Sequence, residues 1–292
     1  MDVDPRASRH PVVVVGEFDG VHVGHRRLVA AAAALAERER RPLVAVVLHD
    51  TRAATHLDEV ESVCRRLLLA GIASARVLSV DSAALDAGPS VVDLIAGELE
   101  PAQVVMACLP EHGDSARYPA LRPGLAQRRI EVVEVERALG ADGAPVSSRS
   151  IRALLLDGRA AAAGAALGRA YALAGEVVHG SGLGHTIGFP TANVPPPTAR
   201  LLPALGVYAG IVRLPGGDQH PAAINVGVRP TVELAGSVLV EAHLLDFDGD
   251  LYGARIDVAF HHRLRGERRF ESVDTLIAQL RRDVDDTRRA LR

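Results

Sequence analysis

Hydrophobic residues in the first part of the chain form short uninterrupted runs that are separated by longer helical stretches. Five of these runs are predicted strands, and the first two are typical of strands buried on both faces of a sheet. They lie at residues 11–16, 42–49, 75–80, 102–108 and 129–135. The stretches between them, such as residues 59–72 and 90–99, have helical periodicity. Strands alternating with helices predict a parallel sheet covered by helices, as in a Rossmann-like α/β domain.

The pattern changes near residue 175, after two further helical stretches at 150–159 and 160–170. Short runs then follow at close spacing, with glycine, proline and aspartate between them. These runs lie at residues 175–180, 206–214, 220–227, 238–247 and 254–264. They predict a small antiparallel β-barrel. We therefore predict an α/β domain over residues 1–170 and a barrel domain over residues 171–292.

A helix is predicted at the end of the chain. Ser272 is a suitable N-cap for it, because a serine hydroxyl can accept a hydrogen bond from a free backbone amide of the first turn. One apolar stripe follows at helical spacing. It consists of Val273, Leu276, Ile277, Leu280 and Val284.

Composition narrows the function classes. The chain has 292 residues and a net charge of −3, which favours neither a nucleic-acid surface nor an anionic membrane. All 33 basic residues are arginine, which excludes a lysine-dependent P-loop or Schiff base. Cys64 and Cys108 make no disulfide framework, and no signal peptide or transmembrane span is visible. We expect a cytoplasmic protein, and the oligomeric state stays open.

The first predicted strand runs directly into the sequence GEFDGVHVGHRRL at residues 16–28. His22 and His25 flank Gly24 where the strand gives way to a helix. Backbone amides at a helix N-terminus attract anions, and a glycine lets a phosphate approach the backbone. Two imidazoles beside such a site are able to donate hydrogen bonds to a phosphate during its transfer. This segment is therefore a candidate nucleotide site.

The arrangement resembles the HxGH motif of nucleotidylyltransferases. The string at residues 16–25 is also similar to the opening of bacterial bifunctional riboflavin kinase/FMN adenylyltransferases, or FAD synthetases. The sequence SSRSIR at residues 147–152 resembles a second motif of that family. The resemblance implies a nucleotidylyltransferase-like N-terminal domain in which the two motifs hold the nucleotide. The residues it implies for this role are Phe18, His22, Gly24, His25, Ser147, Ser148 and Arg152.

Two segments of the N-terminal half depart from the family pattern. Residues 48–56 read LHDTRAATH where the family carries a Phe-x-Pro-x-Pro-like stretch, and residues 106–114 read MACLPEHGD where it carries Gly-x-Asp-Phe-x-Phe-Gly. Those family segments shape the pocket for the flavin and the nucleotide. We therefore expect nucleotide binding in this domain, with weak or absent conversion of FMN to FAD.

The sequence GSGLGHTIGFPTANV at residues 180–194 combines flexible backbone with hard oxygen donors. Its glycines offer backbone amides for an anion-binding nest, and Thr191 and Asn193 offer oxygens that suit Mg²⁺ shared with ATP. The predicted nucleotide-phosphate set is Gly180, Gly182, Gly184, His185, Thr191 and Asn193. Glu241, in the middle of a predicted strand, shares a largely apolar face with Leu239, His243 and Leu245. A carboxylate in that position is a candidate general base, with a solvated strand face as the alternative.

From Tyr171 onward the chain resembles bacterial riboflavin kinase domains. Five motifs occur in the family's order, at residues 175–194, 202–210, 224–232, 240–253 and 263–283. The resemblance implies phosphorylation of riboflavin to FMN with Mg²⁺ and ATP, and it places the family's catalytic base at Glu241. The charge run of Arg265, Glu267, Arg268 and Arg269 is given no catalytic role, because such runs are usually solvated.

Three alternatives stay open for the N-terminal domain. It could complete a fully bifunctional enzyme that also converts FMN and ATP to FAD and diphosphate. It could act on another phosphorylated metabolite, or be a non-catalytic scaffold. The partners expected for the whole chain are the small molecules riboflavin, FMN and ATP, with no nucleic acid and no membrane.

Overall fold

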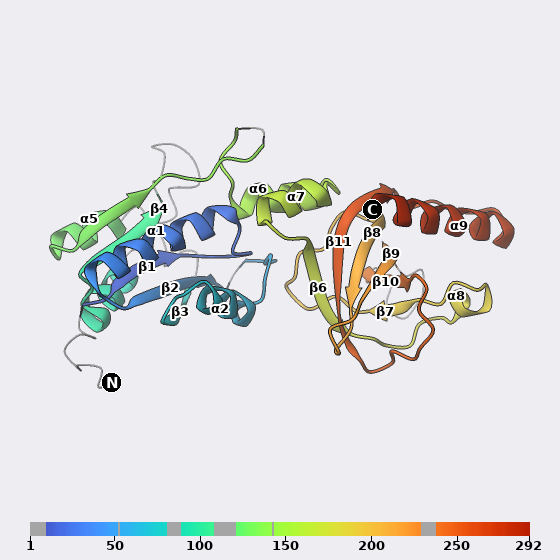
Figure 1. Ribbon diagram of the computed structural model, residues 1–292, viewed down its shortest axis with the longest axis horizontal. Helices are drawn as coiled ribbons and strands as arrows, with labels where there is room; N and C mark the ends of the chain where they lie inside the picture. The colour runs from blue at the N-terminus through green and yellow to red at the C-terminus, as the bar shows by residue number, and fades with distance from the viewer. Residues whose placement is uncertain (1–9, 52, 81–88, 108–120, 142, 229–237) are drawn as a thin grey trace. The chain divides into compact units, whose positions relative to one another are not determined.

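The computed structural model describes residues 10–51, 53–80, 89–107, 121–141, 143–228 and 238–292 (Figure 1). Packing divides the chain into two compact units, Met1–Ser148 and Arg149–Arg292. The predicted helices at 150–159 and 160–170 form α6 (Ser148–Leu156) and α7 (Ala160–Leu167), which pack with the second unit. The domain boundary after residue 170 stays a prediction.

The first unit is built on a parallel sheet of five strands in the order β3-β2-β1-β4-β5. These strands are β1 (Val12–Gly16), β2 (Leu43–Asp50), β3 (Ser74–Val80), β4 (Gln103–Ala107) and β5 (Glu131–Val135). The predicted α/β sheet is thereby confirmed. The strand order reverses between β1 and β4, and in open α/β sheets ligands bind beyond the carboxyl ends of the strands at such a point. The segment that carries both predicted histidines follows directly on β1.

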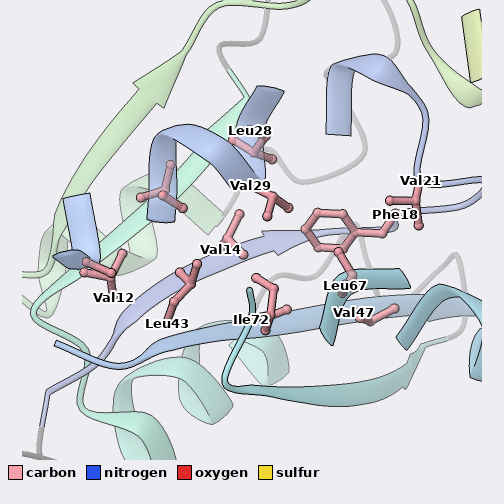
Figure 2. Packing of buried hydrophobic residues seen from close by; sticks show 14 of the residues in the cluster. Val12, Val14, Phe18, Val21, Leu28, Val29, Leu43, Val47, Leu67 and Ile72 are labelled. Carbon is pink, nitrogen blue, oxygen red and sulfur yellow. The ribbon is translucent and has the colours of Figure 1, made fainter. Parts of the chain in front are cut away.

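Helices cover this sheet and enclose two hydrophobic layers. They are α1 (Val23–Glu39), α2 (Val60–Leu69), α4 (Pro89–Asp93) with a following π-helical turn η1 (Leu94–Leu99), and α5 (Leu121–Gln127). Val12 and Val14 of β1 face a core shared with α1 and α2, as Figure 2 shows, whereas Val13 and Val15 face the opposite core. Alternate side chains of β1 are thus buried on both faces, as its continuous valine run predicts. Cys64 packs against the first core, and Cys108 lies outside the described residues.

The second unit is a curled antiparallel sheet of six strands in the order β6-β11-β8-β9-β10-β7 (Figure 1). Its strands are β6 (Tyr171–Glu176), β7 (Ala192–Val194), β8 (Gly206–Arg213), β9 (Gln219–Val228), β10 (Val238–Leu244) and β11 (Arg255–Arg265). A bridge from Val178 to Asn193 joins the segment after β6 to β7, so the two ends of the sheet approach each other. This architecture confirms the predicted barrel-like domain.

Two short elements of the second unit were not predicted from the sequence pattern. The helix α8 (Leu183–Thr186) and the strand β7 lie within the glycine- and proline-rich stretch 180–194, where no apolar period is long enough to be recognised. In addition, β6 begins at Tyr171, earlier than the predicted strand at 175–180. Tyr171 is buried, and its hydroxyl donates a hydrogen bond to the carbonyl oxygen of Leu201.

The predicted terminal helix is α9 (Val273–Ala290), and Ser272 caps it as expected through a reciprocal pair of hydrogen bonds with Thr275. Its stripe does not form a closed core. Val273 is exposed, while Leu276, Leu280 and Val284 line a cavity. The buried residues of α9 are instead the polar Asp283 and Thr287. The helix therefore turns apolar side chains toward a space that is open to a ligand.

Candidate active sites

The nucleotide-site candidate of the first unit is built around the start of α1. His22 is the N-cap, and its Nδ1 accepts a hydrogen bond from the backbone N–H of His25 at 3.3 Å. The two imidazole rings stack with their centroids 3.7 Å apart, and the ring of Phe18 lies 5.2 Å from that of His25. Burial, and secondarily the neighbouring His22, holds the pKa of His25 well below its usual range. A neutral His25 ring therefore stands beside the free amides of the helix.

The loop between β1 and α1 is held by Asp19, a buried residue that sequence reasoning missed. Its carboxylate accepts hydrogen bonds from the backbone amides of Leu57 and Asp58, at 2.9 and 3.1 Å. Its own carbonyl oxygen accepts a hydrogen bond from the Ser148 hydroxyl at 2.9 Å. The Asp-Gly pair at 19–20, typical of a turn, was the signal that could have found it. Asp19 thus ties the histidine loop to the second predicted motif.

The remaining residues predicted for this site do not all lie in the first unit. Gly24 leaves space beside His22, because a Cβ at position 24 would lie 3.1 Å from the Nδ1 atom of that ring. Ser147 is partly buried in the segment that leads to α6. Arg152 lies on α6, within the second unit, and its grouping with the histidines stays a prediction.

The two divergent segments of the N-terminal half are only partly described. At the end of β2, the rings of His49 and His56 stack with centroids 4.8 Å apart. Residues 108–114 of the other segment lie outside the described residues. The segment at 48–56 thus has a stacked pair of histidine rings where the family carries a phenylalanine.

The kinase-site candidate of the second unit is a cavity of about 320 Å³. Every residue predicted for phosphate, metal or base chemistry in this domain lines it. These are Gly180, Gly182, Gly184, His185, Thr191, Asn193 and Glu241. Sheet pairing brings them together, since β7 carries Asn193 beside Glu241 of β10. The glycine-rich segment that begins at Gly180 and the strand that carries Glu241 are far apart in sequence, yet they line one site.

Glu241 lies between two asparagines. It pairs in register with Asn193 of β7 on one side and with Asn225 of β9 on the other. The Asn225 Nδ2 atom donates a hydrogen bond to Glu241 Oε2 at 3.2 Å. The expectation of a largely apolar surrounding is therefore wrong: along β10 the neighbours are apolar or histidine, but across the sheet they are amides. Period-two counting identifies the neighbours along β10 but not those on the adjacent strands.

Thr191 and Asn193 form a site with hard oxygen donors. Asn193 is buried, its Nδ2 donates to the carbonyl oxygen of Thr191 at 3.2 Å, and its Oδ1 has no hydrogen-bond partner among the described residues. Gly180 has no side chain to crowd it, because a Cβ there would lie 2.6 Å from Oδ1. A buried amide oxygen without a donor suits a cation, so these residues fit Mg²⁺.

The far side of the cavity is organised by a buried ion pair that sequence reasoning missed. Arg265, at the end of β11, donates from Nε and Nη2 to the Asp283 carboxylate at 2.9 and 2.7 Å. Their side chains are 13% and 2% exposed. Gln279 also donates to this carboxylate, and the Arg265 guanidinium lies 5.9 Å from the centre of the Phe270 ring. The predicted solvated charge run is therefore wrong for Arg265, which fastens α9 to the sheet.

A second cavity of about 350 Å³ adjoins the first. Both cavities are lined by His185, Pro190, Thr191 and Tyr252. Glu241 lines only the first, whereas Phe247, Leu251 and the acidic residues Asp248 and Asp250 line only the second. Thr191 thus stands where the two spaces adjoin.

Family models define the class of the protein as an enzyme of flavin nucleotide synthesis. Residues 167–291 match the riboflavin kinase model, and residues 4–71 match the FAD synthetase model. A bifunctional riboflavin kinase/FMN adenylyltransferase of Escherichia coli K12 is 34% identical over 93% of this chain and 90% of its own length. The corresponding protein of Bacillus subtilis is 27% identical over 94% of this chain and 90% of its own length. The chain belongs to the family of bifunctional riboflavin kinase/FMN adenylyltransferases.

One solved structure extends the likeness to three dimensions. A crystal structure described as a macrolide-efflux protein from Streptococcus pneumoniae superimposes with a TM-score of 0.83 at 28% identity, covering 98% of this chain and 95% of that one. Within the described ranges, none of the helices combines the length and apolar composition needed to cross a membrane. The same ranges contain no cluster of three histidine, cysteine or acidic side chains suited to a metal.

The two family matches also bear on the N-terminal domain. An FAD synthetase match, together with bifunctional relatives that cover nearly the whole chain, favours full bifunctionality over weak or absent FMN adenylyltransferase activity. The expectation of weak activity gave too much weight to two short segments. The FAD synthetase match covers residues 48–56 despite their divergence.

Proposed function

We propose that the chain carries out two successive reactions. The C-terminal domain phosphorylates riboflavin with ATP, giving FMN and ADP. The N-terminal domain then joins FMN to the AMP portion of a second ATP, giving FAD and diphosphate. The single observation that carries this proposal is the gathering of all predicted kinase residues around one cavity with Glu241 beside Asn193. The bifunctional relatives support the second reaction.

In the kinase reaction, the Glu241 carboxylate takes the proton of the riboflavin 5′-hydroxyl. The alcohol oxygen then forms a bond to the γ-phosphorus of ATP, while the bond from that phosphorus to the β–γ bridging oxygen breaks and ADP leaves. Because Glu241 lines only the first cavity, riboflavin occupies that cavity. Thr191 borders both cavities, so the phosphates lie where the cavities adjoin and the rest of the nucleotide extends into the second cavity.

The apolar side chains of α9 explain why a flavin suits the first cavity. Leu276, Leu280 and Val284 line it together with Phe270. An isoalloxazine ring is large and flat and needs apolar walls, whereas its ribityl chain needs polar ones. The cavity offers both, with α9 on one side and the strand amides on the other. Tethering of α9 through Arg265 and Asp283 keeps the apolar wall in place.

Mg²⁺ is the proposed cofactor of this reaction, held by the Thr191 hydroxyl and the Asn193 Oδ1 atom. Bound there with ATP, the cation would neutralise charge on the phosphate oxygens. The protein's own residues do the remaining work. The backbone at Gly180, Gly182 and Gly184 approaches the phosphates closely, and Asn193 keeps its amide oxygen turned away from the Thr191 carbonyl.

In the adenylyl transfer, a phosphate oxygen of FMN attacks the α-phosphorus of ATP and diphosphate leaves. The free amides at the start of α1 hold the nucleotide phosphates. His22 is fixed as the N-cap, and His25 is kept neutral, so its ring N–H donates a hydrogen bond to a phosphate oxygen without titrating near neutral pH. Ser148 supports the loop through the Asp19 carbonyl.

A direct assay tests both reactions. Purified protein is incubated with riboflavin, ATP and Mg²⁺, and riboflavin, FMN and FAD are separated by chromatography over time. We expect FMN to appear first and FAD to follow. Absence of FMN with any divalent metal would remove the kinase proposal, and FMN that accumulates without FAD would remove the second reaction alone.

A further inference from the structure

The placement of asparagine in this chain is unusual. Among 292 residues only two are asparagine, Asn193 and Asn225. Both pair in register with the same residue, Glu241, one from each neighbouring strand. Asn193 belongs to the proposed metal site, whereas nothing described so far requires an amide at position 225. A residue type used twice in the whole chain, and both times beside one carboxylate, points to a role at that carboxylate.

The two side-chain amides offer different groups to the site, an oxygen from Asn193 and an N–H from Asn225. Asn193 uses its Nδ2 for the Thr191 carbonyl and keeps its Oδ1 free of partners among the described residues. Asn225 turns its Nδ2 to Glu241 Oε2 at 3.2 Å. An ionised carboxylate only accepts hydrogen bonds, so the amide nitrogen is the group that must face it. One asparagine thus offers an oxygen and the other an N–H.

The surroundings of Asn225 hold its amide close to the carboxylate. A Cβ at Gly227 would lie 3.0 Å from Asn225 Nδ2 and 2.7 Å from Glu267 Oε1, so this glycine leaves the space that both side chains use. The strand β9 fixes the backbone of Asn225 between β8 and β10. The Asn225 carboxamide therefore occupies the space beside Gly227, within hydrogen-bond distance of Glu241.

We propose that Asn225 is a positioning residue of the phosphoryl transfer: it holds Glu241 by Oε2 and leaves Oε1 to take the proton of the substrate alcohol. This inference rests on the proposed function, in which Glu241 is the base. A carboxylate with one oxygen fixed has a single orientation in which to meet the hydroxyl, and proton transfer requires that geometry before anything else. Asn225 acts on the reaction through Glu241.

The test is a double-mutant cycle on the full chain, with FMN formation as the readout. Asn225→Ala is expected to lower kcat about 10-fold, as expected for the loss of one hydrogen bond to a charged group, while riboflavin and Mg·ATP bind within about twofold of wild type. In the Glu241→Gln background, the same change is expected to have less than about a twofold effect, because the base that Asn225 orients is gone. Gln219→Ala removes an exposed amide from the same strand and is the matched control, with unchanged turnover.

A second variant guards against a folding defect. Asn225→Asp has the same shape but cannot donate when ionised and adds a like charge, so kcat should fall further than in Asn225→Ala at similar thermal stability. Full turnover in Asn225→Ala, or a loss that adds completely to that of Glu241→Gln, overturns the inference while leaving the base in place. Full turnover in Glu241→Gln alone instead overturns the base assignment on which it rests.

Discussion

The two halves of the chain hold their candidate site residues in different ways. In the kinase half, Asn193, Asn225 and Glu241 lie on three adjacent strands, so the hydrogen-bonded register of the sheet fixes their spacing. In the N-terminal half, His22 and His25 lie where a loop enters a helix, and Asp19 holds that loop through backbone amides. A sheet positions side chains across strands, whereas a loop must be tied down by a buried polar group.

This difference predicts that substitutions can abolish one of the two reactions and leave the other intact. A change at Glu241 should stop one reaction without touching the other, because Glu241 lines the cavity of the second unit. Glu241→Gln is expected to lower kcat for FMN formation by about 10²–10⁴-fold, since the hydroxyl loses its base. Riboflavin binding, followed by quenching of flavin fluorescence, should be retained. FAD formation from supplied FMN is the internal control, and near wild-type kinase turnover would remove Glu241 from the mechanism.

The tie between α9 and the sheet should dominate stability in the kinase half. Asp283→Ala leaves the Arg265 guanidinium buried without its main partner, so the free energy of unfolding should fall by about 3 kcal/mol. Denaturant unfolding measures this. Arg288→Ala is the matched control, because Arg288 of the same helix pairs with Asp246 on the exposed surface and its loss should cost less than about 1 kcal/mol. Equal losses in both variants would contradict the role given to Asp283.

The reciprocal experiment changes the candidate site of the N-terminal half. His25→Ala should lower conversion of FMN to FAD by about 10²-fold, because a neutral donor beside the helix amides is lost. Kinase activity in the same preparation should stay at the wild-type level. FAD formation that survives the change would show that His25 is a packing residue next to Phe18 and not part of the site.

The smallest effect is expected at the proposed metal site. Thr191→Ala should weaken Mg·ATP binding about 10-fold while riboflavin affinity stays the same, because its hydroxyl is only one of several donors to the cation. Calorimetry with each ligand separately distinguishes the two. Thr198→Ala changes an exposed threonine near the same strand and should alter neither. A parallel loss of both affinities in Thr191→Ala would indicate local misfolding instead.

The features that the sequence predicted best are those whose determining residues lie close together along the chain. The continuous valines of β1 indicate a strand buried on both faces, and the motif at 180–194 contains the glycines, Thr191 and Asn193 that line the cavity. Ser272 was recognisable as an N-cap because capping is local. Glu241 could be proposed as a base because a motif surrounds it. In each case the sequence signal lies within a few residues along the chain.

What the sequence could not provide are pairings between distant segments. Asn225 meets Glu241 only because β9 lies beside β10, and Arg265 meets Asp283 because α9 folds back on β11. Period-two counting along β10 described the neighbours of Glu241 as apolar for the same reason. Asp283 resembles any acidic residue on a charged helix until the fold buries it. Strand register and helix packing are properties of the tertiary structure, and they determine which partners a charged side chain has.

The junction of the two kinase cavities has a consequence for inhibitor design. Both spaces are bordered by His185, Pro190, Thr191 and Tyr252, so the reacting ends of two ligands meet beside these side chains. A single compound that joins a flavin analogue to an adenosine analogue through a short anionic linker would bind its second half at a high effective concentration. Such a compound should bind about 10²-fold or more tightly than either half alone. The linker length that binds best would then measure the separation of the two ligand ends at Thr191.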